Sequence, residues 1–191
     1  ASLAISVAAL KDAEVEAVAI CFLHSYLRPE HEAAARAAVE NALPGVYITC
    51  SSDILPEFRE FERMSTTAIN ATLGPKMDGY LERFGKRVQD VGIRVAPYTI
   101  HSNGGLMPVE MVRAAPVRTC VSGPAAGVVG AAEVGRAAGL PHLVTFDVGG
   151  TSTDVSLVEN ATPLFTSSRL VAGYPVKTPM VDIHVIGAGG G

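Results

Sequence analysis

The chain has 191 residues, which is enough for one large domain or for parts of two. Apolar residues make up 48% of the chain and charged residues 18%, a composition that excludes a disordered chain. The net charge of −4 provides no positively charged surface of the kind that binds nucleic acid. The apolar run Val18–Leu23 is far shorter than a membrane span and no secretory signal is visible, so we expect no membrane partner.

Three cysteines, Cys21, Cys50 and Cys120, each lie in an apolar, strand-like run, and none has a CxxC neighbour. Isolated cysteines in odd number favour reduced, buried thiols over a disulfide or a metal site. We therefore expect a cytoplasmic protein.

The first fifty residues predict two strands, each preceded by a helix. Residues 1–13 are typical of the end of a helix, and Val18–Leu23, apolar on both faces, is typical of a central strand. Pro29 begins a helix with an apolar stripe at helical spacing, and Pro44-Gly45 ends it. Val46–Cys50 then predicts the second strand.

Residues 57–91 predict mostly helix, divided at Gly74-Pro75 because Pro75 suits the first turn of a new helix. A charge run near its start favours a solvated face, although a cleft-lining role stays open; the run comprises Arg59, Glu60, Glu62 and Arg63.

Shorter elements follow. Residues 94–101 predict a strand in which Pro97 favours an edge or a bulge. Residues 108–114 predict a short helix, and Val117–Val121 predicts another strand.

Ser122-Gly123-Pro124 predicts a helix start, with Ser122 as the capping residue, and an Ala- and Gly-rich helix over 125–138. Its small residues predict close packing against a neighbour, which would offset about 1 kcal/mol per interior glycine. Leu143–Val148 and Asp154–Val158 predict strands joined by a turn, and β-like stretches follow at 163–171 and 180–186.

Alternating strands and helices followed by a β-meander indicate an α/β fold. We place a domain boundary near Gly123, with residues 1–122 in the first domain and 123–191 in the second.

The segment Thr145–Asp154 (TFDVGGTSTD) has the residue pattern of a phosphate-binding turn between two strands. Gly149 and Gly150 let the chain reverse without Cβ atoms, so backbone N–H groups can face a phosphate. The hydroxyls of Thr151, Ser152 and Thr153 add donors. Asp147 and Asp154 flank the turn and would repel bare phosphate, so a divalent cation such as Mg²⁺ is the natural mediator and both carboxylates are candidate catalytic and metal-binding groups.

This string resembles the phosphate loop of the actin-like ATPase superfamily, whose fold is ribonuclease H-like. Flanking segments narrow the resemblance to the hydantoinase A / 5-oxoprolinase family. They are AICFLHSY (19–26), LPEFREFERMSTT (55–67), HSNGGLMP (101–108), PVRTCVSGPAAGVVGA (116–131) and VAGYPVKTPMVDIHVIGAGGG (171–191).

The resemblance implies ATP and Mg²⁺ as cofactors, a cyclic amide such as 5-oxoproline or a hydantoin as substrate, and an amide oxygen activated for ring opening. Related members are subunits of acetone and acetophenone carboxylases, so the alternative is an ATP-binding subunit that needs a hydantoinase-B-like partner chain or domain. Full-length members carry another such loop upstream, which implies an internal fragment, inactive alone, spanning the end of one actin-like domain and the start of a second.

Secondary sites are less distinct. Asn103 and Gly104, in a turn after a strand, are candidate substrate-binding residues, with a plain turn as the alternative. The resemblance favours a nucleotide-binding turn at Gly187, Gly189 and Gly190, with a flexible tail as the alternative. Asp182 and His184 share a strand face but are too few for a zinc site, and His101 has no clear partner in the sequence.

Overall fold

The computed structural model describes residues 2–191, which form two compact units that exchange segments along the chain. Of the described residues, the first unit contains 2–97, 109–117 and 170–177, and the second contains 98–108, 118–169 and 178–191. Each is described by itself. The chain passes from the first unit to the second between Val117 and Arg118, close to the domain boundary that is expected from the sequence near Gly123. The assignment of 1–122 and 123–191 to two actin-like domains stays a prediction.

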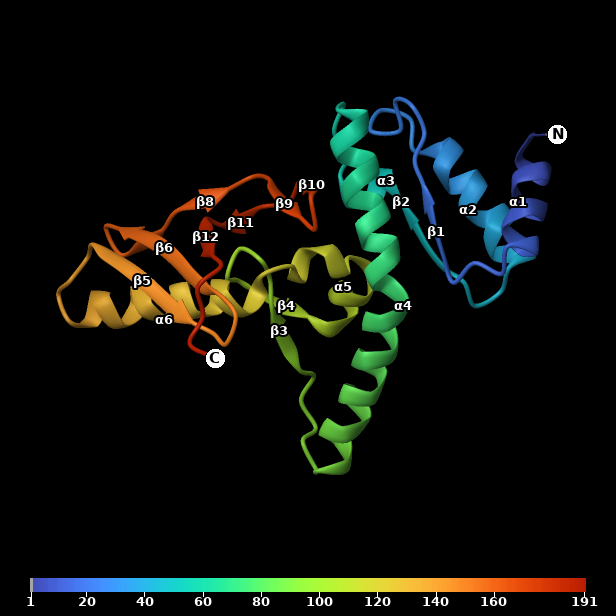
Figure 1. The fold of residues 1–191 in the computed structure, drawn as a ribbon. Helices are drawn as coiled ribbons and strands as arrows, with labels where there is room; N and C mark the ends of the chain where they lie inside the picture. Colours follow the sequence, from blue (N-terminus) through green and yellow to red (C-terminus); the bar gives the residue numbers. More distant parts are fainter. Residues whose placement is uncertain (1) are drawn as a thin grey trace. The chain divides into compact units, whose positions relative to one another are not determined.

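The first unit is built on two parallel strands, β1 (Ala17–Ile20) and β2 (Tyr47–Cys50), with Ile20 opposite Cys50. Figure 1 shows them between α4 (Glu60–Asp90) on one side and the pair α1 (Ser2–Asp12) and α2 (Glu30–Ala42) on the other. Five buried residues, Val18, Ile20, Ala35, Val39 and Cys50, form the core between the strands and α2. The expected apolar stripe of α2 therefore packs as predicted.

The remaining elements of this unit are short. They are α3 (Ser51–Ile54), α5 (Val109–Ala114), the start of a 3-10 helix η1 (Pro116–Thr119), most of β9 (Arg169–Val171) and β10 (Tyr174–Val176). Among residues 2–191, no helix is both long and apolar enough to cross a membrane.

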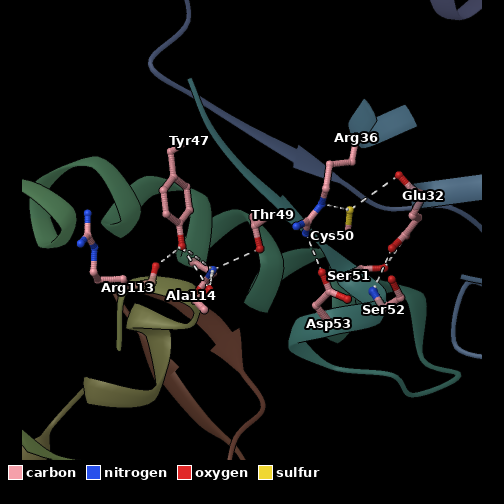
Figure 2. A network of polar contacts seen from close by, with 11 residues as sticks. Glu32, Arg36, Tyr47, Thr49, Cys50, Ser51, Ser52, Asp53, Arg113 and Ala114 are labelled. Carbon is pink, nitrogen blue, oxygen red and sulfur yellow. Dashed lines mark hydrogen bonds and ion pairs between the residues drawn. The ribbon is translucent and has the colours of Figure 1, made fainter. Parts of the chain in front are cut away.

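A polar network joins α2, β2 and α3 (Figure 2). The buried carboxylate of Glu32 accepts hydrogen bonds from Ser51 Oγ at 2.7 Å and from the amides of Ser52 and Phe22, both at 2.8 Å. Burial alone would raise the pKa of Glu32, but these hydrogen bonds hold it below its ordinary value. Glu32 thus anchors the chain after both parallel strands.

A second part of the network fixes α5 against α4. Asn70, fully buried, donates to Thr49 Oγ1 at 3.1 Å and accepts from the amide of Val117 at 3.1 Å. Tyr47 Oη donates to the carbonyls of Arg113 at 2.9 Å and Ala114 at 3.2 Å (Figure 2). These bonds satisfy backbone groups that lie outside any sheet.

Three sequence expectations are wrong here. The helix α4 runs unbroken through Pro75. Residues 116–119 form a 3-10 turn in place of a strand, because the Val117 amide bonds to Asn70. Arg63 is fully buried and does not lie on a solvated face: it donates to the carbonyls of Glu57 and Phe22 and lies over the ring of Tyr26.

The second unit combines one helix with antiparallel strands. The helix α6 (Ser122–Ala137) packs on a sheet of order β12–β6–β5, formed by β5 (Leu143–Val148), β6 (Thr153–Glu159) and β12 (Ile183–Ile186), with β7 (Thr162–Pro163) also paired to β6. Two further pairs are β3 (Tyr98–Ile100) with β4 (Leu106–Pro108) and β8 (Phe165–Thr166) with β11 (Met180–Val181). The predicted β-meander is confirmed.

The core of this unit explains the composition of α6. Ala125, Val128 and Ala132 pack against Val158, Val181 and Ile183. A Cβ at Gly135 would lie 2.5 Å from Leu143 Cδ1 and 2.8 Å from the Leu140 carbonyl oxygen. The close packing expected of this small-residue helix is therefore present at Gly135.

Candidate functional site

The TFDVGGTSTD segment forms the β5–β6 hairpin. The strands are antiparallel, with Asp147 opposite Asp154 and Val148 opposite Thr153. The turn between them is closed by a hydrogen bond from the Gly149 amide to the Ser152 carbonyl at 2.8 Å. The expected strand–turn–strand is thus present, and the two aspartates are directly opposed in its register.

This pairing of like charges is unfavourable in the absence of a cation, because directly opposite residues lie close together in an antiparallel pair. Within the part of the chain that the structure describes, no group of three or more His, Cys, Asp or Glu side chains could hold a metal ion. Two carboxylates nevertheless fit Mg²⁺, which commonly takes one or two protein carboxylates and completes its octahedron with waters and phosphate oxygens.

Asp147 and Asp154 also line a cavity of about 620 Å³ between β5 and α6. The helix side of this cavity is made of small and apolar residues, including Pro124, Gly127 and Val128. The carboxylate pair therefore borders a space that extends along α6.

The glycine-rich segment after β12 lies against the same turn. The amide of Gly190 donates to the Gly149 carbonyl and that of Gly191 to the Gly150 carbonyl, both at 3.0 Å. A Cβ at Gly189 would overlap the Gly150 carbonyl, so only glycine permits this approach. The structure thus brings together two candidate segments that are almost forty residues apart in sequence, Gly149–Thr153 and Gly187–Gly190.

Some of the candidate phosphate donors are already engaged. Thr153 Oγ1 donates to the Ala188 carbonyl at 2.5 Å, and the Gly149 amide closes the turn. Among residues 2–191, no protein acceptor takes the amides of Gly150, Thr151 and Ser152. The donors of this turn that remain available to a ligand are therefore these three amides, together with the hydroxyls of Thr151 and Ser152.

The second candidate region, the loop His101–Gly105 between β3 and β4, is fixed by hydrogen bonds. Ser102, fully buried, donates its amide at 2.7 Å and its hydroxyl at 2.6 Å to the Arg118 carbonyl, and its own carbonyl accepts from Val181. Gly104 has φ = +80°, and a Cβ there would overlap Val129 of α6. Asn103 and Gly104 are thus held at defined positions against the first half of α6.

His101 was not assigned a role from the sequence, yet its ring takes part in this loop. Its Nδ1 accepts the Asn103 amide at 3.0 Å. Burial and the nearby Arg118 guanidinium together lower the pKa of His101 below its ordinary value. Only the fold could reveal this arrangement, because Arg118 is distant in sequence.

Two other sequence assignments change. Ser122 is the first helical residue of α6 and not its cap; Val121 precedes it with φ = +57°, and no side chain caps the turn. His184 lies in β12 opposite Val155, while Asp182 lies before the strand and bonds through its backbone to Leu164 and Ser156. These two side chains form no metal site with a third ligand among the described residues.

Comparisons with known proteins agree with this architecture. Residues 63–191 match the family model described as hydantoinase/oxoprolinase, and residues 1–43 match that of its N-terminal region. The caprolactamase subunit alpha of Pseudomonas jessenii is 35% identical over 95% of this chain and 26% of its own length. The chain belongs to the hydantoinase/oxoprolinase family.

Solved structures show the same fold. A crystal structure of an ATP-dependent caprolactamase from Pseudomonas jessenii matches 99% of this chain and 27% of its own, with 33% identity and a TM-score of 0.87. A nucleotide-free acetone carboxylase structure matches 98% of this chain and 27% of its own, with 27% identity and a TM-score of 0.85. The predicted fold class is confirmed, and the chain spans about a quarter of the length of these relatives.

Proposed function

We propose that the protein containing this chain uses Mg·ATP to activate the carbonyl of a cyclic amide for ring opening. The observation that carries the proposal is the β5–β6 turn, where an opposed Asp147–Asp154 pair, free turn amides and the 187–191 glycine segment lie together. Relatives named as an ATP-dependent caprolactamase and as 5-oxoprolinases support it.

The residues divide by role. Asp147 and Asp154 would hold Mg²⁺, which relieves their mutual repulsion. The amides of Gly150, Thr151 and Ser152 would donate to phosphate oxygens, while Gly189 and Gly190 would keep that side of the turn free of side chains. The chemistry that bound Mg·ATP supplies is phosphoryl transfer that activates the amide oxygen.

Asn103 and Gly104 are the proposed substrate-binding residues. Their loop packs on Ala125 and Val129 of α6, while the cavity beside the two carboxylates is lined by Pro124 and Gly127 of the same helical turns. The two regions thus adjoin the same part of α6 within one unit, a placement that suits an amide presented to a nucleotide.

A second candidate function is ATP-dependent carboxylation by a complex in which the parent protein is one subunit. The likeness to an acetone carboxylase structure favours it, and so do relatives named as subunits of caprolactamase and of acetone carboxylase. A hydantoinase-B-like partner chain would then complete the reaction.

The test measures ATP hydrolysis by the full-length parent protein with 5-oxoproline, a hydantoin and caprolactam in turn, and identifies the products. We expect one cyclic amide to stimulate ATP hydrolysis and to yield the ring-opened acid. Turnover that needs a ketone and bicarbonate supports the second candidate and overturns the first. We also expect the 191 residues alone to bind Mg·ATP weakly or not at all by calorimetry, because they carry only one of the family's two loops.

A further inference from the structure

Three side chains around the His101–Gly105 loop keep hydrogen-bond donors that no protein group uses. Asn103 Oδ1 accepts the Gly105 amide at 2.9 Å, which leaves its Nδ2 amide free. Among the described residues, His101 Nε2 bonds to no protein group and the Arg118 guanidinium makes no ion pair. Ser102 ties the Arg118 backbone to this loop through two hydrogen bonds, and the Arg118 charge acts on the His101 ring.

The hydrogen bond to His101 Nδ1 determines the state of the ring. Because the Asn103 amide donates to Nδ1, that nitrogen must be unprotonated, and the neutral ring therefore carries its proton on Nε2. A protonated ring would bring two donors together and would add a second positive charge beside Arg118. His101 is thus a neutral donor with a fixed tautomer.

Arg118 supplies positive charge at the same place. Arg118 is partly buried, and burial of His101 and the Arg118 charge lower the pKa of His101, although a hydrogen bond with the Asn103 side chain opposes this shift. The side of α6 that supports the loop presents the apolar side chain of Val129 and the backbone carbonyl of Ala125 beside Gly104. A half-buried cation, a neutral imidazole N–H and an amide N–H2 on a fixed loop suit a ligand with electron-rich oxygen atoms.

We propose that His101, Asn103 and Arg118 form the subsite that binds the oxygen atoms of the cyclic-amide substrate, with the His101 Nε2–H donating to an amide carbonyl oxygen. The inference rests on the proposed function and adds His101 and Arg118 to its substrate site. A donor aimed at the carbonyl strengthens as negative charge develops on that oxygen, so the subsite would favour activation as well as binding.

The experiment uses the full-length parent protein and compares His101→Ala, His101→Gln and Arg118→Ala in steady-state kinetics. We expect His101→Ala and Arg118→Ala each to raise the KM for the cyclic amide by about 10-fold or more, with the KM for ATP unchanged. His101→Gln retains an N–H donor and should stay within about 3-fold of the wild type. Matched controls are His142→Gln and Arg136→Ala, which change exposed residues of the same unit.

A raised KM for ATP with an unchanged KM for the amide would assign these donors to nucleotide phosphate and overturn the proposal. Equal kinetics of His101→Ala and wild type would overturn it while leaving the proposed function intact. A wild-type parent that shows no amide-dependent turnover would overturn both.

A pH profile separates binding from a merely structural role. Since only neutral His101 has the required tautomer, kcat/KM for the amide should fall as the pH drops through the pKa of His101, which lies below its ordinary value. That acid limb should disappear in His101→Gln. An acid limb that persists unchanged in this variant would contradict the proposal.

Discussion

Gly74 of α4 lies directly under the ring of Tyr47 in β2, so closely that a Cβ on Gly74 would overlap the ring. The same tyrosine donates to the carbonyls of Arg113 and Ala114. One glycine in a 31-residue helix therefore permits the contact between helix and sheet, and it also positions the residue that fixes the end of α5.

We predict opposite effects for two identical substitutions in α4. Gly85 has no neighbour within 4 Å of its would-be Cβ, so Gly85→Ala should stabilise the helix by about 0.5–1 kcal/mol through propensity. Gly74→Ala should instead destabilise the protein by about 1–3 kcal/mol, because Tyr47 must move. Urea denaturation followed by circular dichroism measures both, and stabilisation by Gly74→Ala would contradict the packing described here.

Elements that are determined by a local sequence pattern could be predicted from the sequence alone. The α2 stripe, the β5–β6 hairpin and the later meander follow from periodicity and from Gly-Gly at a turn. Val117 shows why other elements could not be predicted: its apolar neighbours favour a strand, but its amide bonds to Asn70, 47 positions away. A side-chain acceptor that arrives through tertiary structure leaves no local signal.

Arg63 is a second residue whose environment is determined by tertiary contacts and not by its sequence neighbours. Its neighbours Arg59, Glu60 and Glu62 make a charge run, yet the carbonyls of Phe22 and Glu57 receive its guanidinium in the interior. In the candidate site, the sequence predicted the turn and the glycine segment separately, and only the fold placed them in contact. His101 and Arg118 required the fold altogether.

Glu32 should make stability depend on pH in the acid range. Its pKa is below the ordinary value in the folded protein, so its stabilisation is fully present above the unfolded pKa and is lost as pH falls through the folded pKa. We predict that Glu32→Gln costs about 2–3 kcal/mol near pH 7, because an amide cannot accept from all of Ser51, Ser52 and Phe22. The difference from wild type should shrink toward pH 3.

The measurement is the denaturation midpoint of both proteins from pH 3 to pH 7. Glu40→Gln serves as the control, because Glu40 is an exposed residue of the same helix. A Glu32→Gln variant with the same deficit at every pH would show that the carboxylate charge is not responsible.

The Asp147–Asp154 pair should oppose stability until a cation binds. Without metal, Asp147→Asn removes a like-charge contact, and we predict a rise of about 1–2 °C in the thermal midpoint of the parent protein. With Mg·ATP the wild type should have the higher thermal midpoint of the two proteins, since only the wild type gains stability from the ligand. Differential scanning calorimetry with and without Mg·ATP tests both signs, and equal stabilisation of the two proteins by Mg·ATP would remove Asp147 from the metal site.

The glycine segment offers a test of the phosphate-binding turn that leaves its carboxylates unchanged. Gly189→Ala places a Cβ against the Gly150 carbonyl, so it should push residues 187–191 away from the turn and break the bonds from Gly190 and Gly191. Gly187→Ala adds the same methyl group where nothing lies within 4 Å. In the full-length parent we expect Gly189→Ala to raise the KM for ATP about 10-fold or more and Gly187→Ala to change it less than about 3-fold. Comparable KM values for the two variants would mean that contact between the glycine segment and the turn does not contribute to nucleotide binding.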